Sequence, residues 1–298
     1  MDEKELAALI QAWLASRRSE NTRAAYRGAL ESFTASGRDL LTATSLNMVT
    51  YMQELKKEGL KEATINLRMA AISSFYGFGI RHGALTYNPA DVERIKISPY
   101  GKSTWLDDTQ ARALLSKINR STPQGTRDYA LFYGYLMTGL RNTPWREARW
   151  EDFENQGGKI YMRWSCKGKS DQKAPIAPPL WDCLLLLATI TERNQGFVFS
   201  GFHQTDYAEQ ALAGSSVNKL LKVYARKAGL DPMKVHVHTL RHAAAMLRLK
   251  AGDDVLQISK FLGHSNIAIT QIYLDHLNNN VQDSWQMVSD FLGHRKGK

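Results

Sequence analysis

The stretch that decides the fold runs His238-Thr239-Leu240-Arg241-His242, then Leu262-Gly263-His264-Ser265, then Ile272-Tyr273. It sets a His-x-x-Arg pair, a second His and a lone Tyr in order, with Tyr273 nine residues after His264. A Tyr hydroxyl has an unperturbed pKa of about 10 and is a poor nucleophile. It becomes useful when cationic and acid–base groups surround an anionic substrate. Arg and His side chains beside one Tyr therefore indicate attack on a phosphate.

Two earlier segments extend this pattern. Thr138-Gly139-Leu140-Arg141 places an Arg at a predicted helix end, and its guanidinium offers a rigid fork of donors suited to phosphate oxygens. Lys167-Gly168-Lys169 forms the tip of a predicted β-hairpin, ahead of Ala174-Pro175-Ile176. Taken together, the segments between residues 138 and 273 resemble the tyrosine recombinase (phage integrase) family, whose members carry them in this order.

The resemblance implies a mainly α fold, with an N-terminal helical-bundle (SAM-like) core-binding domain. An α-rich catalytic domain with a small antiparallel β-hairpin or sheet would follow it. The implied reaction is site-specific DNA recombination through a 3′-phosphotyrosyl intermediate, without a metal or other cofactor. The residues that the resemblance assigns to catalysis are Arg141, Lys167, His238, Arg241, His264 and Tyr273 (the nucleophile).

Each catalytic residue has an implied role. Tyr273 would attack the phosphate, while Arg141, Arg241 and His264 neutralise the charge of the transition state. Lys167 would protonate the leaving 5′ oxygen, with Lys169 as its rival two positions on. His238 would assist proton transfer, as a base toward Tyr273.

Several details depart from this pattern or compete with it. Family members carry an acidic residue three positions after the first Arg, and here that position is Pro144, with Glu147 one turn further on. His242 follows Arg241 on the same predicted helix face, where a structural role is the more common one. His236, His238 and His242 could in principle bind zinc, but no Cys or acidic partner stands at metal-ligand spacing.

The composition fits a polyanionic partner. The chain has 298 residues, with 39 Lys and Arg against 29 Asp and Glu, a net charge of +10 and a pI of about 9.5. Two cysteines are too few for a disulfide framework. We see neither a signal peptide nor an apolar run long enough to span a bilayer, so we expect a soluble, cytoplasmic, nucleoid-associated protein.

Hydrophobic periodicity predicts two domains. Four helices fall within residues 1–97, which we interpret as the DNA-binding bundle. Turn residues mark a linker at 98–104, and the resemblance implies that residues 105–298 form the catalytic domain. Alternating apolar residues at 160–164 and a return at 173–176 predict the hairpin. Helices are expected near 107–115, 129–139, 180–190, 216–228, 239–251, 255–262 and 265–273.

The resemblance also implies partners. We expect double-stranded DNA as the substrate and a homotetramer holding two DNA sites. The segment 281–292 carries an apolar stripe that could dock in cis or on a neighbouring protomer, formed by Val281, Trp285, Met287, Val288, Phe291 and Leu292. Alternatives are a topoisomerase of type IB, a DNA-binding module that has lost catalysis, and a metal nuclease. The sequence leaves open whether the protein acts as an integrase, a resolvase or a transposon recombinase.

Overall fold

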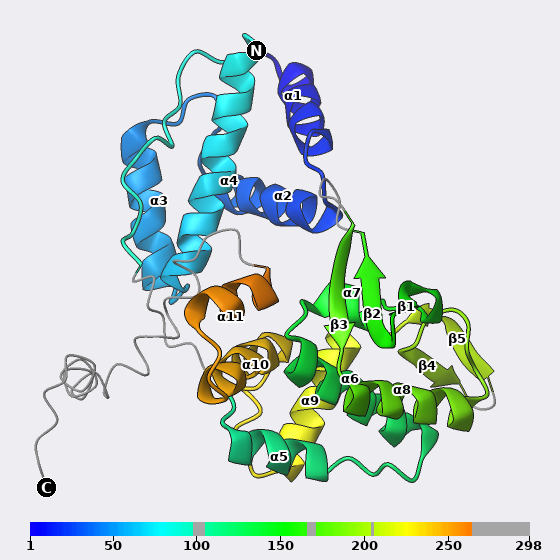
Figure 1. Ribbon diagram of the computed structural model, residues 1–298. Helices are drawn as coiled ribbons and strands as arrows, with labels where there is room; N and C mark the ends of the chain where they lie inside the picture. Colours follow the sequence, from blue (N-terminus) through cyan, green and yellow to red (C-terminus); the bar gives the residue numbers. More distant parts are fainter. Residues whose placement is uncertain (98–104, 166–170, 204–205, 264–298) are drawn as a thin grey trace, which may run out of the picture. The chain divides into compact units, whose positions relative to one another are not determined.

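The computed structural model describes residues 1–97, 105–165, 171–203 and 206–263 (Figure 1). The chain divides into two compact units, Met1–Gly101 and Lys102–Lys298. The assignment of residues 1–97 to DNA binding and of 105–298 to catalysis stays a prediction. The predictions for Lys167, His264 and Tyr273, and for the segments 265–273 and 281–292, fall outside the described residues.

The first unit is a bundle in which the longest helix contacts the three others. Its helices are α1 (Glu3–Ala15), α2 (Glu20–Ala35), α3 (Ser45–Lys57) and α4 (Glu62–Arg81). Helix α4 packs against α1, α2 and α3 (Figure 1). Asp2, Ser19 and Thr44 begin the first three helices, because each side chain accepts a backbone N–H of the first turn.

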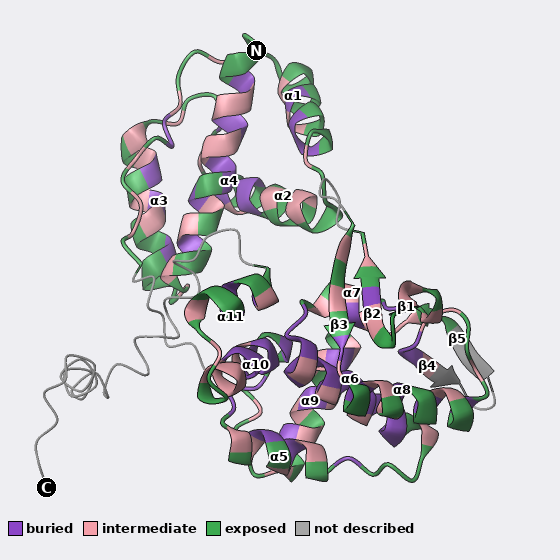
Figure 2. Ribbon diagram, viewed as in Figure 1, coloured by how far each residue is buried: buried purple, intermediate pink, exposed green. Residues whose placement is uncertain are grey.

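Aromatic side chains fill the core of this bundle. Trp13 and Phe75 are fully buried and meet edge to face, with ring centroids 5.5 Å apart. Phe33 and Tyr51 form a second such pair at 5.1 Å. Figure 2 shows the buried residues of each helix on the faces turned toward the others. The bundle therefore has its own core, as an independently folding domain requires.

The second unit is mainly helical. Its described helices are α5 (Asp108–Ser116), α6 (Pro123–Thr138), α7 (Asn142–Arg146), η1 (Trp150–Asp152), α8 (Pro178–Thr191), α9 (Gly214–Lys227), α10 (Val237–Lys250) and α11 (Val255–Leu262). Helix α6 is the central element, because it contacts α5, α7, α8, α10 and strand β3. No helix within the described ranges is both long and apolar enough to cross a membrane.

Two small antiparallel sheets complete this unit. Strands β1 (Phe153–Gln156), β2 (Lys159–Trp164) and β3 (Gln172–Ile176) pair in that order. Strands β4 (Ser200–His203) and β5 (Asp206–Ala211) form a separate pair. In the first sheet Ile160 pairs with Ile176 and Trp164 with Gln172, so β2 and β3 form the hairpin whose tip was predicted to carry Lys167.

The core of the second unit also encloses an ion pair. Arg127 and Asp128 are 6% and 2% exposed, and the guanidinium donates two hydrogen bonds, of 2.9 and 2.7 Å, to the same carboxylate oxygen. Tyr224 of α9 donates to the other oxygen at 2.8 Å, and Arg127 also donates to the Ser200 carbonyl at 2.9 Å. These bonds tie α6 to α9 and β4, and they compensate for the burial of two charges.

The mainly α prediction with a small antiparallel sheet is confirmed, with some differences in detail. Helix α6 begins at Pro123 rather than near 129, because Thr122 caps it and proline at the first position fits a helix start. Strands β1, β4 and β5 and the short helix α7 were not expected. β1 is short and polar, and a tight turn through Gly157 and Gly158, both with positive φ, joins it to β2.

Candidate active site

The end of α6 sets the position of Arg141. Gly139 caps the helix in the left-handed conformation, with φ of 59°. A Cβ at this position would lie 2.7 Å from Cε1 of Phe261 on α11, so glycine is required both by its backbone and by the close approach of α11. The chain then turns through buried Leu140 and begins α7, for which Arg141 is the N-cap residue.

The start of α10 carries the next two predicted residues. His236 caps this helix, so His238 and Arg241 both lie in its first turns. Asn218 of α9 fixes the entry of the chain, because its side-chain oxygen accepts the backbone N–H of Val237 at 3.2 Å.

Arg241 is buried and joins the ends of two other helices. The residue is 4% exposed. Its guanidinium donates one hydrogen bond to the carbonyl of Gly139 and another, of 2.6 Å, to the carbonyl of Leu262. These carbonyls stand at the C-terminal ends of α6 and α11, two residues before Arg141 and two residues before His264. One guanidinium therefore holds both segments.

Three predicted residues, Arg141, His238 and Arg241, meet in one hollow of about 350 Å³. One hundred residues separate the two arginines in the sequence. Among the described residues that line this hollow there is no carboxylate; the remaining lining residues are Leu140, Asn142, Asn218, His236 and Val237. The hollow can therefore bind an anion through the guanidinium fork of Arg141, which is exposed.

A second hollow, of about 230 Å³, adjoins the first, since Leu140, Arg141 and Arg241 line both. Residues of β2 and β3 line it on one side, and α11 and Gly263 contribute on another. Its described lining again lacks carboxylates and adds three cations: Lys173, Arg248 and Lys260. The two hollows give a run of positive charge with Arg141 at the junction.

The positive surroundings act on His238. Partial burial lowers the pKa of this imidazole, and the charges of Arg241, His236 and Arg141 lower it further. The ring is therefore neutral at neutral pH, as a proton acceptor must be. The ring of His242 packs edge to face on His238, with centroids 4.9 Å apart, so His242 supports the orientation of His238 from one helical turn away.

The substitution at position 144 leaves Arg141 without a carboxylate partner among the described residues. Pro144 lines the second hollow. Glu147, the alternative acidic residue, accepts a hydrogen bond from Arg146 instead. The fork of Arg141 therefore makes no ion pair with the part of the chain that the structure describes.

Our sequence analysis did not assign His236, or the cations Lys173, Arg248 and Lys260, to the site. His236 drew attention only as a possible zinc ligand, although its place two residues before His238 is an N-cap position. Lys260 immediately precedes the segment Phe261 to His264; it is exposed on α11 and lines the second hollow. Lys167, His264 and Tyr273 lie outside the described residues.

A hollow whose described lining holds two arginines, a histidine with a lowered pKa and no carboxylate is suited to a phosphodiester and to proton exchange beside it. Comparisons with known proteins identify the family. Residues 104–280 match the phage integrase family, and residues 9–83 match the phage integrase N-terminal SAM-like domain.

Named relatives and solved structures agree with this match. The chain is 30% identical to tyrosine recombinase XerC of Chromobacterium violaceum, over 92% of this chain and 90% of the relative. It is 29% identical to tyrosine recombinase XerD of Listeria innocua, over 86% and 88%. A lambda integrase dimer bound to a COC′ core site has a similar fold, with a TM-score of 0.71 and 18% identity over 90% of this chain and 93% of that one.

The chain belongs to the phage integrase family. It is a tyrosine-type site-specific recombinase, an enzyme that breaks and rejoins DNA through a covalent phosphotyrosine intermediate.

Proposed function

We propose that Tyr273 is the nucleophile and that the scissile phosphate binds at Arg141, where the two hollows meet. The observation that carries this proposal is the convergence of Arg141, His238 and Arg241 on one hollow whose described lining has no carboxylate. Arg141 presents its fork to the non-bridging oxygens and stabilises the charge of the pentacoordinate transition state. Gly263 lines the adjoining hollow, so the chain leaves α11 beside this position and His264 is the next residue.

In the proposed step the Tyr273 oxygen attacks phosphorus in line and the bond to the 5′ oxygen breaks. His238 accepts the phenolic proton, and Lys167 gives a proton to the departing 5′ oxygen. The products are a 3′-phosphotyrosyl link and a free 5′ hydroxyl. Attack by a 5′ hydroxyl from a second duplex reverses the step, so the phosphodiester energy is retained and no ATP is consumed. Trp164 and Gln172, at the described ends of β2 and β3, line the second hollow, which supports this role for the hairpin tip.

Covalent trapping tests this function. A nicked suicide substrate carrying the protein's own site is incubated in EDTA with wild type and with Tyr273→Phe. We expect an SDS-resistant protein–DNA adduct with wild type and none with the variant. Arg141→Gln should bind the site and form the adduct far more slowly. If wild type binds its site and forms no adduct, the protein is a binding module and the catalytic assignment is wrong.

We also propose that the first unit grips the DNA backbone. In this unit Arg23 is paired with Glu20 at 3.0 Å and donates to the Arg17 carbonyl, while Arg68 donates to the Ser32 hydroxyl at 2.8 Å. Such partners fix the direction of a guanidinium before DNA arrives. Arg27 and Arg81 complete the proposed set. Binding of this kind would keep the protein at the nucleoid.

The working form would be a homotetramer on two DNA sites, with the segment 281–292 docked on a neighbouring protomer. An apolar groove of about 410 Å³ supports this proposal; it is lined by Ala111, Leu115, Tyr133, Leu136, Met137, Ala244, Leu247 and Ala251, with Asp108, Arg112 and Arg248 at its polar part. The apolar stripe of 281–292 has the complementary chemistry.

A cysteine pair tests this docking. Ala251→Cys lies in the groove and Phe291→Cys lies on the stripe, and disulfide formation on DNA is read on a denaturing gel. A cross-linked dimer from a mixture of the two single variants supports exchange between protomers. A cross-link found only within the doubly substituted chain would mean that the segment docks on its own protomer.

A further inference from the structure

His236 stands in the anion-binding hollow with Arg141, His238 and Arg241, yet none of the proposed steps uses it. Its Nδ1 accepts the backbone N–H of Thr239 at 3.0 Å and so caps α10. A ring nitrogen that accepts an N–H carries no proton, so in the neutral ring the proton is on Nε2. Within the described residues, Nε2 has no hydrogen-bond partner, and it remains for a ligand of the hollow.

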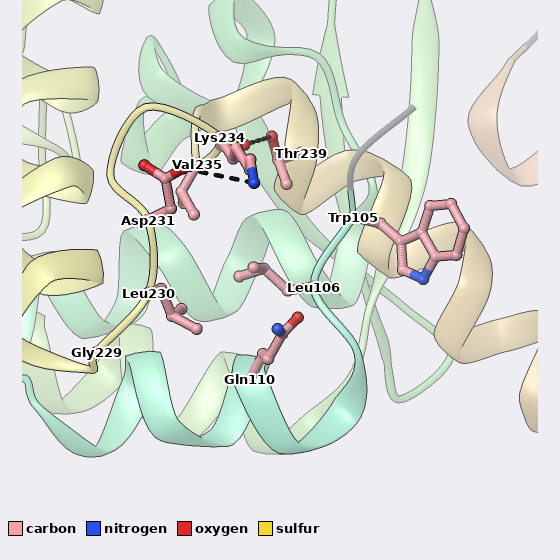
Figure 3. A pocket seen from close by; sticks show the side chains of 9 residues that line it. All are labelled: Trp105, Leu106, Gln110, Gly229, Leu230, Asp231, Lys234, Val235 and Thr239. Carbon is pink, nitrogen blue, oxygen red and sulfur yellow. Dashed lines mark hydrogen bonds and ion pairs between the residues drawn. The ribbon is translucent and has the colours of Figure 1, made fainter. Parts of the chain in front are cut away.

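The loop before α10 holds His236 rigidly. Thr239 donates its hydroxyl to the Lys234 carbonyl at 3.1 Å, a tie that Figure 3 shows together with the 3.6 Å ion pair between Lys234 and Asp231. The Thr239 hydroxyl also lies 2.8 Å from Nδ1 of His236. Both contacts are made to Nδ1, so one edge of the imidazole is held before DNA binds, and a positioned ring is what an effective hydrogen-bond donor needs.

We propose that His236 is a further phosphate-binding residue, whose Nε2–H donates to a non-bridging oxygen of a DNA phosphate seated in this hollow. The ligand is a phosphodiester, either the scissile one at Arg141 or the one next to it. This inference rests on the proposed function, because it takes the hollow as the DNA site. It assigns to one residue two separable tasks, capping through Nδ1 and binding through Nε2.

The two tasks call for two variants. His236→Ser keeps the cap, because serine is a preferred N-cap residue, but its short side chain cannot bring a donor to the position of Nε2. His236→Ala removes both the cap and the donor. If His236 binds phosphate, His236→Ser should melt with wild type and form the suicide adduct roughly 2- to 10-fold more slowly, the range of one net hydrogen bond. If His236 is a cap only, the serine variant should cleave at the wild-type rate, and that result overturns the proposal.

A binding cycle identifies the phosphate. In a Tyr273→Phe background, which prevents covalent product, affinities are measured for DNA with a single methylphosphonate at the scissile position or at each flanking position. When the methylphosphonate replaces the phosphate that His236 contacts, the loss of affinity caused by His236→Ser should shrink toward one-fold, because the phosphate partner of His236 is already altered. An undiminished loss at every position would contradict a direct contact. Absence of an adduct with otherwise wild-type protein would instead refute the proposed function, so the two failures are distinguishable.

Discussion

Replacing Gly134 by alanine should destabilise the second unit by a predictable amount. The same substitution should also displace Arg141. A Cβ at Gly134 of α6 would lie 2.0, 2.3 and 2.5 Å from three atoms of the Trp145 indole. Trp145 is fully buried on α7, the short helix that begins directly after Arg141, and its Nε1 donates to the Leu131 carbonyl at 2.9 Å. Gly134→Ala should therefore push the indole away and break this hydrogen bond.

The magnitude follows from three contributions. Overpacking costs about 1–3 kcal/mol, and an indole N–H left buried without its acceptor costs about 1–3 kcal/mol more. Alanine in place of glycine in a helix interior stabilises the helix by about 1 kcal/mol, which offsets part of this cost. The net destabilisation is about 3 kcal/mol, which for a unit of this size lowers the melting temperature by about 6–12 °C. Because Arg141 moves with α7, adduct formation should fall by up to about 100-fold.

Calorimetry is the appropriate assay, since two units can give two transitions. Gly28→Ala is the matched control: this helix glycine in α2 has nothing within 4 Å of the added Cβ, so the substitution should stabilise the first unit by up to about 1 kcal/mol. Combining Gly134→Ala with Trp145→Phe should cost less than the sum of the single changes, because the smaller ring admits the methyl group. A rise in the melting temperature of Gly134→Ala, as in the control, would mean that Trp145 does not pack against Gly134.

Three further predictions concern the hollows. Gly139→Ala places an L-residue at φ of 59° and a Cβ 2.7 Å from Phe261, so the denaturation midpoint should drop by an amount equivalent to about 2–4 kcal/mol; an unchanged midpoint would contradict the close packing of α11. Lys260→Gln should weaken binding to every DNA sequence alike and lower the slope of log affinity against log salt by about one, measured by fluorescence anisotropy; an unchanged slope would remove Lys260 from the DNA surface. The pKa of His238 is lowered, so this ring stays neutral as pH falls through about 6.5, the ordinary histidine value, and the cleavage rate should decline only at lower pH. Arg141→Gln removes one of the charges that lower this pKa, so it should raise the midpoint of the His238 titration measured by NMR. A wild-type midpoint at or above about 6.5 would refute the prediction.

Elements with strong local signals could be predicted from the sequence. Helix α11 has the expected bounds, Val255–Leu262, because Asp254 caps its start and Gly263 ends it in the left-handed conformation. The β2–β3 hairpin was evident from its alternation. The start of α6 at Pro123 was missed, and the first turn of this helix includes Gly125. In the structure glycine is needed there, since a Cβ would lie 1.7 Å from the Asn119 carbonyl oxygen.

The geometry of the site could be predicted only in part. Motif order grouped Arg141, His238 and Arg241, and these three residues line one hollow in the structure; their catalytic roles stay a prediction. The burial of Arg241 could not be foreseen, since an arginine is mostly exposed and its acceptors lie 102 and 21 residues away in the chain. The same holds for Lys260, which becomes a residue of the site only because α11 packs against the end of α6.

The arrangement explains how Arg141 can be oriented although Pro144 occupies the position where family members carry a carboxylate. Its backbone is fixed on both sides: Arg241 binds the carbonyl of Gly139 before it, and buried Trp145 anchors α7 after it. Orientation by the backbone leaves the guanidinium of Arg141 without a carboxylate partner among the described residues, whereas a carboxylate would occupy some of its donors. The position of Arg141 therefore depends on the hydrogen bond that Arg241 donates to the Gly139 carbonyl. Loss of Arg241 should therefore disturb the proposed phosphate site through Gly139 and Leu262, in addition to removing its own charge.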